Sequence, residues 1–181
     1  SPNTELSMPT RPRTALLFAC AGLALGAGAN AVPVVIDLGL SPGGTYSTAG
    51  VVSGDGNVVT GSATTLVGAG TPIRPFRWVY PAGPMVPIPL AIGNLGGEGA
   101  AINFNGSVIV GTANALAFRW TSSSGAVFFP TLAGGTSARA AGVSADGFTT
   151  AGQSTSPQGN RAVKWTATGV ITNLGVLPGA H

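Results

Sequence analysis

One segment of this sequence occurs three times in nearly the same form. The copies span residues 51–61, 101–111 and 142–152, and each has Asp or Asn before a Gly, then four residues, then a second Gly. The glycines that directly follow the Asp or Asn, which we call the turn glycines (Gly56, Gly106 and Gly147), are 50 and then 41 residues apart. Self-similarity at such a period is the signature of a repeat architecture, in which each copy is one supersecondary unit.

Two further elements follow each copy in constant order. The first is an aromatic-basic-aromatic triplet or its close variant, at 76–78, 118–120 and 163–165. The second is a Leu- and Gly-rich turn, at 95–97, 132–135 and 177–179, with one more example ahead of the first copy at 40–44. Because three elements recur in one order, coincidence is a poor explanation and a threefold repeat is indicated.

Each unit reads as four short strands. Asp-Gly or Asn-Gly between alternating apolar runs predicts a hairpin with a tight type I′ turn, so 51–54 should pair with 58–62. The triplet predicts a third strand with Phe118 and Trp120 on one face and Arg119 on the other. A fourth strand is expected at 85–90, 126–129 and 170–174, and the prolines of the first place it at a sheet edge.

The expected fold class is therefore all-β, with repeated four-stranded antiparallel units that resemble propeller blades. The segment 35–38 is predicted as an additional fourth strand that precedes the first complete unit. Three units fall below the four to eight blades usual for a propeller. The count indicates an incomplete array, or a module that completes itself by oligomerising.

The first 31 residues indicate a targeting segment. After Met8 come the basic residues Arg11 and Arg13, an apolar run, and the sequence Ala29-Asn30-Ala31 before Val32. A basic region, an apolar core and an A-x-A site define a secretory signal peptide, here residues 8–31. A transmembrane anchor is the rival interpretation, but the apolar run is short and rich in Gly and Ala. Residues 1–7 are then upstream or non-native sequence.

The predicted working chain is the β-repeat domain 32–181, with units at approximately 40–94, 95–131 and 132–181. Its expected location is outside the cytoplasm: periplasmic, on the cell surface or secreted. Cys20, the single cysteine, lies in the apolar core of the signal peptide. A lipoprotein acylation site at Cys20 is a weaker interpretation, because Phe18 occupies a position that such sites give to a small residue. The predicted mature chain therefore contains no disulfide.

Composition and charge exclude several classes of partner. Charged residues make up 7% of the chain, and from Val32 onward six basic residues stand against four acidic ones, scattered singly. Nucleic-acid binding normally requires a basic stripe or cluster, so no nucleic-acid partner is expected. No stable membrane span is expected once the signal peptide is removed.

Catalytic and metal-binding chemistry finds few candidate residues. Metal sites need clustered His, Cys or carboxylates, whereas the mature chain has one His, His181, and four isolated acids. Asp55 and Asp146 suggest calcium, but both stand where a turn favours Asp, and the second unit has Asn105 at that position. A Ser-His-Asp arrangement would depend on His181 alone. The paired glycines precede no Lys-Ser or Lys-Thr, as phosphate loops require. No catalytic, cofactor-binding or metal-binding residue is assigned, and no enzyme or cofactor is predicted.

The units resemble the HAF-type extracellular repeat of bacterial secreted and surface proteins. The resemblance rests on residues 142–147, 117–121 and 173–179 and extends from about Val35 to the last residue. The His that gives the family its name is replaced by Arg74, Leu116 and Arg161 in the three units. The resemblance implies an extracellular, propeller-like repeat with no catalytic residues to transfer.

Together these observations predict an exported, non-catalytic β-repeat module with a binding or structural role. Its partner would be an extracellular ligand or surface component, and open blade edges offer a surface for self-association. The alternative is a fragment of a larger secreted or surface-anchored protein whose enzymatic or anchoring region lies beyond residue 181.

Overall fold

The computed structural model describes residues 34–66, 72–90 and 96–177. The chain divides into two units, Ser1–Val35 and Ile36–His181, and every strand of the described residues belongs to the second. The predicted signal peptide lies outside the described residues. The described residues contain no helix, and none could therefore cross a membrane as a helix.

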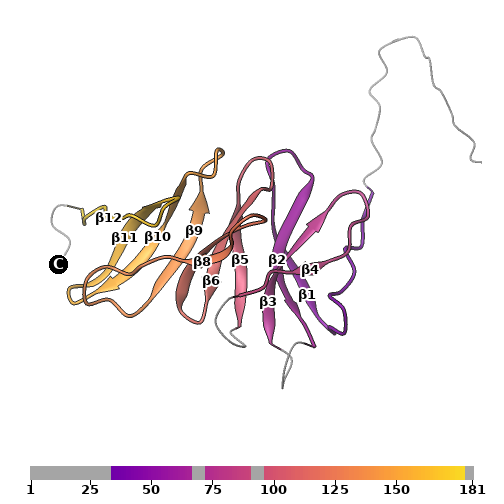
Figure 1. Cartoon of the computed structure of the whole chain (residues 1–181), viewed down its shortest axis with the longest axis horizontal. Coiled ribbons are helices and arrows are strands. Elements are labelled where there is room, and N and C mark those ends of the chain that lie inside the picture. Colours follow the sequence, from indigo (N-terminus) through magenta and orange to yellow (C-terminus); the bar gives the residue numbers. More distant parts are fainter. Residues whose placement is uncertain (1–33, 67–71, 91–95, 178–181) are drawn as a thin grey trace, which may run out of the picture. The chain divides into compact units, whose positions relative to one another are not determined.

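Three four-stranded antiparallel sheets follow one another along the chain (Figure 1). Each sheet takes its strands in sequence order, so every connection within a sheet is a hairpin. Sheet 1 consists of β1 (Ser47–Val52), β2 (Val58–Thr64), β3 (Ile73–Val79) and β4 (Val86–Pro87). Sheet 2 consists of β5 (Gly97–Ile102), β6 (Val108–Ala113), β7 (Leu116–Thr121) and β8 (Gly125–Phe128). Sheet 3 consists of β9 (Ala138–Val143), β10 (Thr149–Ser156), β11 (Gly159–Thr166) and β12 (Ile171–Asn173). The all-β class and the repeated four-stranded unit are confirmed.

The hairpin between the first and second strands of each sheet forms where predicted, but its turn is wider than type I′. In sheet 1 the Gly56 N–H donates to Ser53 O (2.9 Å) and the Ser53 N–H donates to Val58 O (2.8 Å). Only Gly56 in this turn has a positive φ, +77°, whereas a type I′ turn needs two such residues. The prediction of a two-residue turn was wrong, because side-chain oxygens stabilise a longer loop here.

Those side-chain oxygens occupy the same places in all three turns. Ser53 Oγ accepts from the Val58 N–H (2.9 Å), and Asp55 Oδ1 accepts from the Asn57 N–H (3.0 Å). The second turn repeats both bonds from Asn103 and Asn105, and the third repeats them from Ser144 and Asp146. Short Ser, Asn and Asp side chains commonly satisfy loop N–H groups in this way.

The second glycine of each repeat copy faces a β-bulge in the neighbouring strand. The register of the first strand shifts at Gly50, Ala100 and Ala141, one residue in each sheet. A Cβ on Gly61, Gly111 or Gly152 would lie 2.0–2.1 Å from a carbonyl oxygen of that strand. Only glycine fits at this contact, so the repeated second glycine follows from the bulge.

The fourth strand of sheet 1 is a short edge strand, as expected. β4 has only two residues, one of them Pro87, and pairs with β3 alone. The extra strand predicted at 35–38 is not formed: residues 34–40 contain no strand. Leu38 of this segment is partly buried and packs on sheet 1. Its Asp37 Oδ1 accepts from the Gly39 N–H (2.9 Å), a local turn that replaces extended ladder pairing.

The core lies between successive sheets. We call the side of a sheet that faces the next sheet its outgoing face, and the opposite side its incoming face. The triplets alternate as predicted, with Phe76, Phe118 and Trp165 fully buried on incoming faces. The contact between sheets 1 and 2 includes Val58, Ile88, Ile102 and Ile109, and that between sheets 2 and 3 includes Val108, Val110, Phe129, Val163 and Trp165. The hydrophobic core is therefore a series of sheet-to-sheet contacts.

Candidate functional site

The outgoing face of sheet 3 is open to solvent among the described residues. Its outward positions follow from the pairing of β10 with β11, where Ala151 faces Lys164 and Gln153 faces Ala162. All four of these residues are exposed. The equivalent residues of sheet 2, Val110 and Ala117 among them, are buried by sheet 3. Sheet 3 thus presents to solvent a face that is covered in the sheet before it.

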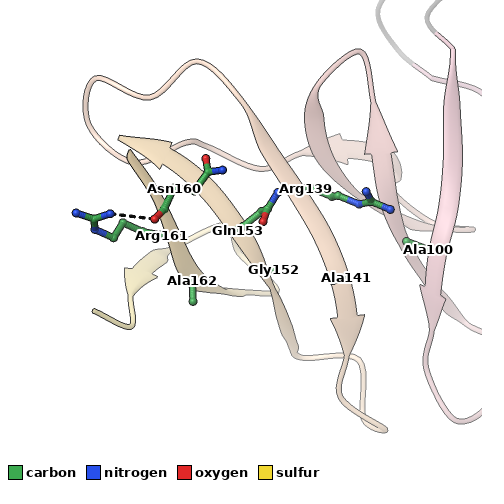
Figure 2. Close-up of a pocket in the computed structure, with 8 residues that line it drawn as sticks. All are labelled: Ala100, Arg139, Ala141, Gly152, Gln153, Asn160, Arg161 and Ala162. Atoms are coloured by element: carbon green, nitrogen blue, oxygen red, sulfur yellow. Dashed lines mark hydrogen bonds between the residues drawn. The ribbon is translucent and has the colours of Figure 1, made fainter. Parts of the chain in front are cut away.

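A hollow of about 610 Å³ lies on this face (Figure 2). Its small lining residues come from β9, β10 and β11 of sheet 3 and from β5 of sheet 2, and the others are polar. The lining residues are Ala100, Arg139, Ala141, Gly152, Gln153, Asn160, Arg161 and Ala162. The small residues leave the backbone of the sheet accessible. The hollow can therefore accept a flat or extended group that hydrogen-bonds to amide side chains.

The two arginines of the hollow do not converge on one point. Figure 2 shows their guanidinium groups directed toward opposite edges. Arg139 Nη2 forms an ion pair with Glu98 Oε1 at 2.9 Å, and both side chains are about half exposed. Arg161 Nη1 donates to Asn160 O (2.9 Å). An exposed pair of this kind adds little stability, so its main effect is to fix the Arg139 side chain beside the hollow.

The carboxylates that the sequence offered as metal or acid-base candidates lie in turns. Asp55 Oδ1 accepts from the Ser53 hydroxyl (2.6 Å) and from the Asn57 N–H, and these bonds hold the pKa of Asp55 below its usual value near 3.8. The Ser144 hydroxyl and the Phe148 N–H lower the pKa of Asp146 in the same way. Both carboxylates are engaged by their own turns. Within the described ranges, no group of three or more His, Cys, Asp or Glu side chains could hold a metal ion.

A second concave surface lies between sheets 1 and 2. It has a volume of about 420 Å³ and is largely apolar; its lining includes Pro84, Pro87, Pro89, Arg77 and Trp120. Trp120 is half-buried and also packs in the core between the sheets. This groove has few hydrogen-bonding groups to fix the orientation of a ligand, so the hollow on sheet 3 is the better candidate.

Sequence reasoning assigned no site residues and did not single out Gln153 or Asn160. A signal for Gln153 was present in the repeat: counted from the turn glycines, it aligns with Ser62 and Thr112. Two β10 residues line the hollow, Gly152 and Gln153. Gly152 is a glycine in all three units, whereas Gln153 is a longer amide where the other units have a hydroxyl side chain. Neither a known family model nor a curated protein matches this chain.

Proposed function

We propose that this chain is an exported, non-catalytic β-repeat module that acts by contact, through the outgoing face of sheet 3. Its partner is an extracellular ligand or surface component, and the chain belongs with HAF-type extracellular repeats. The observation that carries the proposal is the uncovered face itself, with its 610 Å³ hollow and the amide side chains of Gln153 and Asn160. Concave surfaces with a few fixed polar groups are the usual form of binding sites.

The non-catalytic part of the proposal is supported by the state of the carboxylates. Asp55 and Asp146 accept hydrogen bonds from their own turns, and the pKa of each is lowered. A carboxyl group with a lowered pKa is ionised at neutral pH and is a weak base, so it suits neither acid nor base catalysis. Turnover of ester, glycoside or peptide substrates by the purified chain would contradict this part.

The contact role is tested with labelled chain and cell-envelope fractions of the secreting organism. Ala162 lines the hollow and is exposed, so Ala162→Arg places a large side chain in the hollow without disturbing the core. The matched control is Val127→Arg, at an exposed position of β8. We expect the wild-type chain and V127R to bind and A162R to lose binding. Binding that A162R leaves unchanged would rule out this face.

Export is tested separately, by N-terminal sequencing of the chain recovered from a secreting host. The proposal predicts that the mature chain begins at Val32, after the Ala29-Asn30-Ala31 site. A recovered chain that still begins at Ser1 would contradict export through this signal.

A further inference from the structure

The two sheet-to-sheet contacts of the chain are built in the same way. The turn glycine of the later sheet lies over a valine of the earlier one: a Cβ on Gly106 would come within 2.3 Å of Val58, and one on Gly147 within 2.6 Å of Val108. The carbonyls of Gly106 and Gly147 also accept from an arginine of the earlier sheet. These bonds are Arg77 Nε to Gly106 O (3.5 Å) and Arg119 Nη2 to Gly147 O (3.3 Å).

A third shared contact comes from the residue that follows each fourth strand, which we call the anchor residue. The anchors are Ile88, Phe129 and Leu174, and their N–H groups donate to Pro75 O, Ala117 O and Ala162 O. Phe129 stacks on Trp165 of the next sheet, with ring centroids 5.2 Å apart and an interplanar angle of 6°. Ile88 packs between sheets 1 and 2 in the same role.

Sheet 3 carries the outgoing half of this contact, and among the described residues Thr149, Lys164 and Leu174 of this half are exposed. Lys164 stands where the earlier sheets have arginine, and Thr149 where they have valine. The anchor Leu174 has the same backbone bond as Phe129 (2.9 Å), yet it is 57% exposed whereas Phe129 is 3% exposed. The polar side chains Thr149 and Lys164 are compatible with coverage by another sheet. On the outgoing face of sheet 1, Thr60 is fully buried and donates to Phe76 O.

The incoming half of sheet 1 is open in part: Phe76 and Trp78 are buried, but the described residues leave the turn at Gly56 uncovered. No atom of the described residues lies within 4 Å of a Cβ placed on Gly56, although the other two turn glycines are in close contact there. Val52 is 54% exposed, whereas Ile102, at the same position of sheet 2, is 9% exposed. The turn and the end of β1 are therefore open to a neighbour of the kind that covers sheet 2.

One part of the incoming face of sheet 1 is already occupied, by Leu38. Leu38 and Leu174 have the same local structure: the Gly39 N–H donates to Asp37 Oδ1 and the Gly175 N–H donates to Asn173 Oδ1, both at 2.9 Å. Gly39 and Gly175 both have positive φ. Leu38 packs with Phe76 and Trp78, where an anchor residue of a preceding sheet would lie. Leu38 and the anchor residue Leu174 therefore suit the same kind of place on an incoming face.

We infer that the outgoing face of sheet 3 binds the incoming face of sheet 1 in a second copy of this chain, and that Leu174 then takes the place of Leu38. The inference rests on the proposed function, since it names the partner of that same face. It continues a contact that the chain already makes twice. Two copies would bring six sheets together, within the roughly four to eight of closed propellers, and a heterologous contact of this kind closes a ring or extends a filament.

The test is sedimentation equilibrium of the chain as recovered from a secreting host, with three variants. Leu174→Ala should weaken association at least about tenfold, as expected when a central interface side chain is truncated. Leu38→Ala should tighten association, because it weakens the competitor within the chain. Val127→Ala, at an exposed position away from both faces, is the control and should change nothing. Circular dichroism confirms that each variant is folded.

A single-chain mass at all concentrations, or association that Leu174→Ala leaves unchanged, would overturn the inference. Equal weakening by Leu38→Ala and Leu174→Ala would overturn the exchange of the two segments. A chain that stays monomeric but still binds envelope fractions in a manner sensitive to A162R would refute the inference and leave the proposed function standing. Self-association without envelope binding would refute the proposed function and leave the inference standing.

Discussion

Gly111 in β6 faces the main-chain carbonyl of Glu98 in β5 so closely that a Cβ on Gly111 would lie 2.0 Å from that oxygen. The bulge at Ala100 brings the carbonyl over the second strand, and the same contact occurs in the other two sheets. Glycine at this position is therefore required by the fold of the repeat unit, independent of any ligand.

Gly111→Ala is expected to destabilise the chain by about 3 kcal/mol or more, because backbone rather than a flexible side chain must move. The matched control is Gly142→Ala in β9, where no described atom lies within 4 Å of the added Cβ and φ is not positive. That variant should be neutral or slightly stabilising. Urea denaturation of both variants measures the difference, and equal stabilities would show that the bulge contact is wrong.

The turn glycines allow a test of sheet docking within one chain. Asn tolerates positive φ better than other side chains, so Gly56→Asn should have a small effect. Gly106→Asn drives the new side chain into Val58, 2.3 Å from its Cβ position. We expect G106N to be less stable than G56N by about 1–3 kcal/mol, the usual cost of overpacking. Thermal unfolding of the two variants under identical conditions gives the comparison; no difference would argue against the contact of sheets 1 and 2.

Trp165 links sheet 3 to the segment after β8. Its Nε1–H donates to Pro130 O (2.9 Å) and its ring stacks on Phe129. Trp165→Phe removes the donor and leaves space in the core, so a loss of about 2 kcal/mol is expected. Trp120→Phe, at a half-buried position, should cost less. A larger loss for W120F than for W165F in urea titrations would contradict this account of the core.

The turn aspartates predict a dependence of stability on pH. The Ser53 and Ser144 hydroxyls lower the folded-state pKa values of Asp55 and Asp146. A group with a lowered folded pKa stabilises the fold above its unfolded value, near 3.8, and loses that contribution as pH falls through the folded pKa. The melting temperature should therefore decline below about pH 4. The double variant Asp55→Asn/Asp146→Asn should flatten this decline, because the uncharged Asn105 already makes the same backbone bond in the second turn. An unchanged dependence of melting temperature on pH would show that these two carboxylates are not its cause.

Much of the fold could be predicted from sequence because its determinants are local and occur three times. The alternation of Phe118, Arg119 and Trp120 predicts which side chains enter the core, and the order of elements predicts sheets contiguous in sequence. The turn type does not follow from the Asp-Gly pair alone, because Ser53 Oγ accepts from the N–H of Val58 and stabilises a longer loop. The reason for the second glycine was missed because the bulge lies on the facing strand.

The surface features depend on contacts between units and were harder to predict. Leu38 resembles the end of a fourth strand in sequence, but its backbone forms a turn at Asp37 that only the structure shows. Whether Thr149 and Lys164 are covered or open depends on what lies beyond sheet 3. Arg139 beside the hollow is oriented by Glu98 of the preceding sheet, a partner 41 residues away in sequence.

The contact between copies is tested most directly by carbodiimide cross-linking of mixed heavy- and light-isotope chains, followed by mass spectrometry. Lys164 is the only lysine of the chain. Within one chain, Arg119 at the equivalent position bonds to the carbonyl of Gly147, which directly follows Asp146. In the paired copies Lys164 should therefore lie beside Asp55, the counterpart of Asp146, and an amide bond should join Lys164 of one copy to Asp55 of the other in heavy–light hybrids. Absence of a Lys164–Asp55 link, or links only within single chains, would contradict the account.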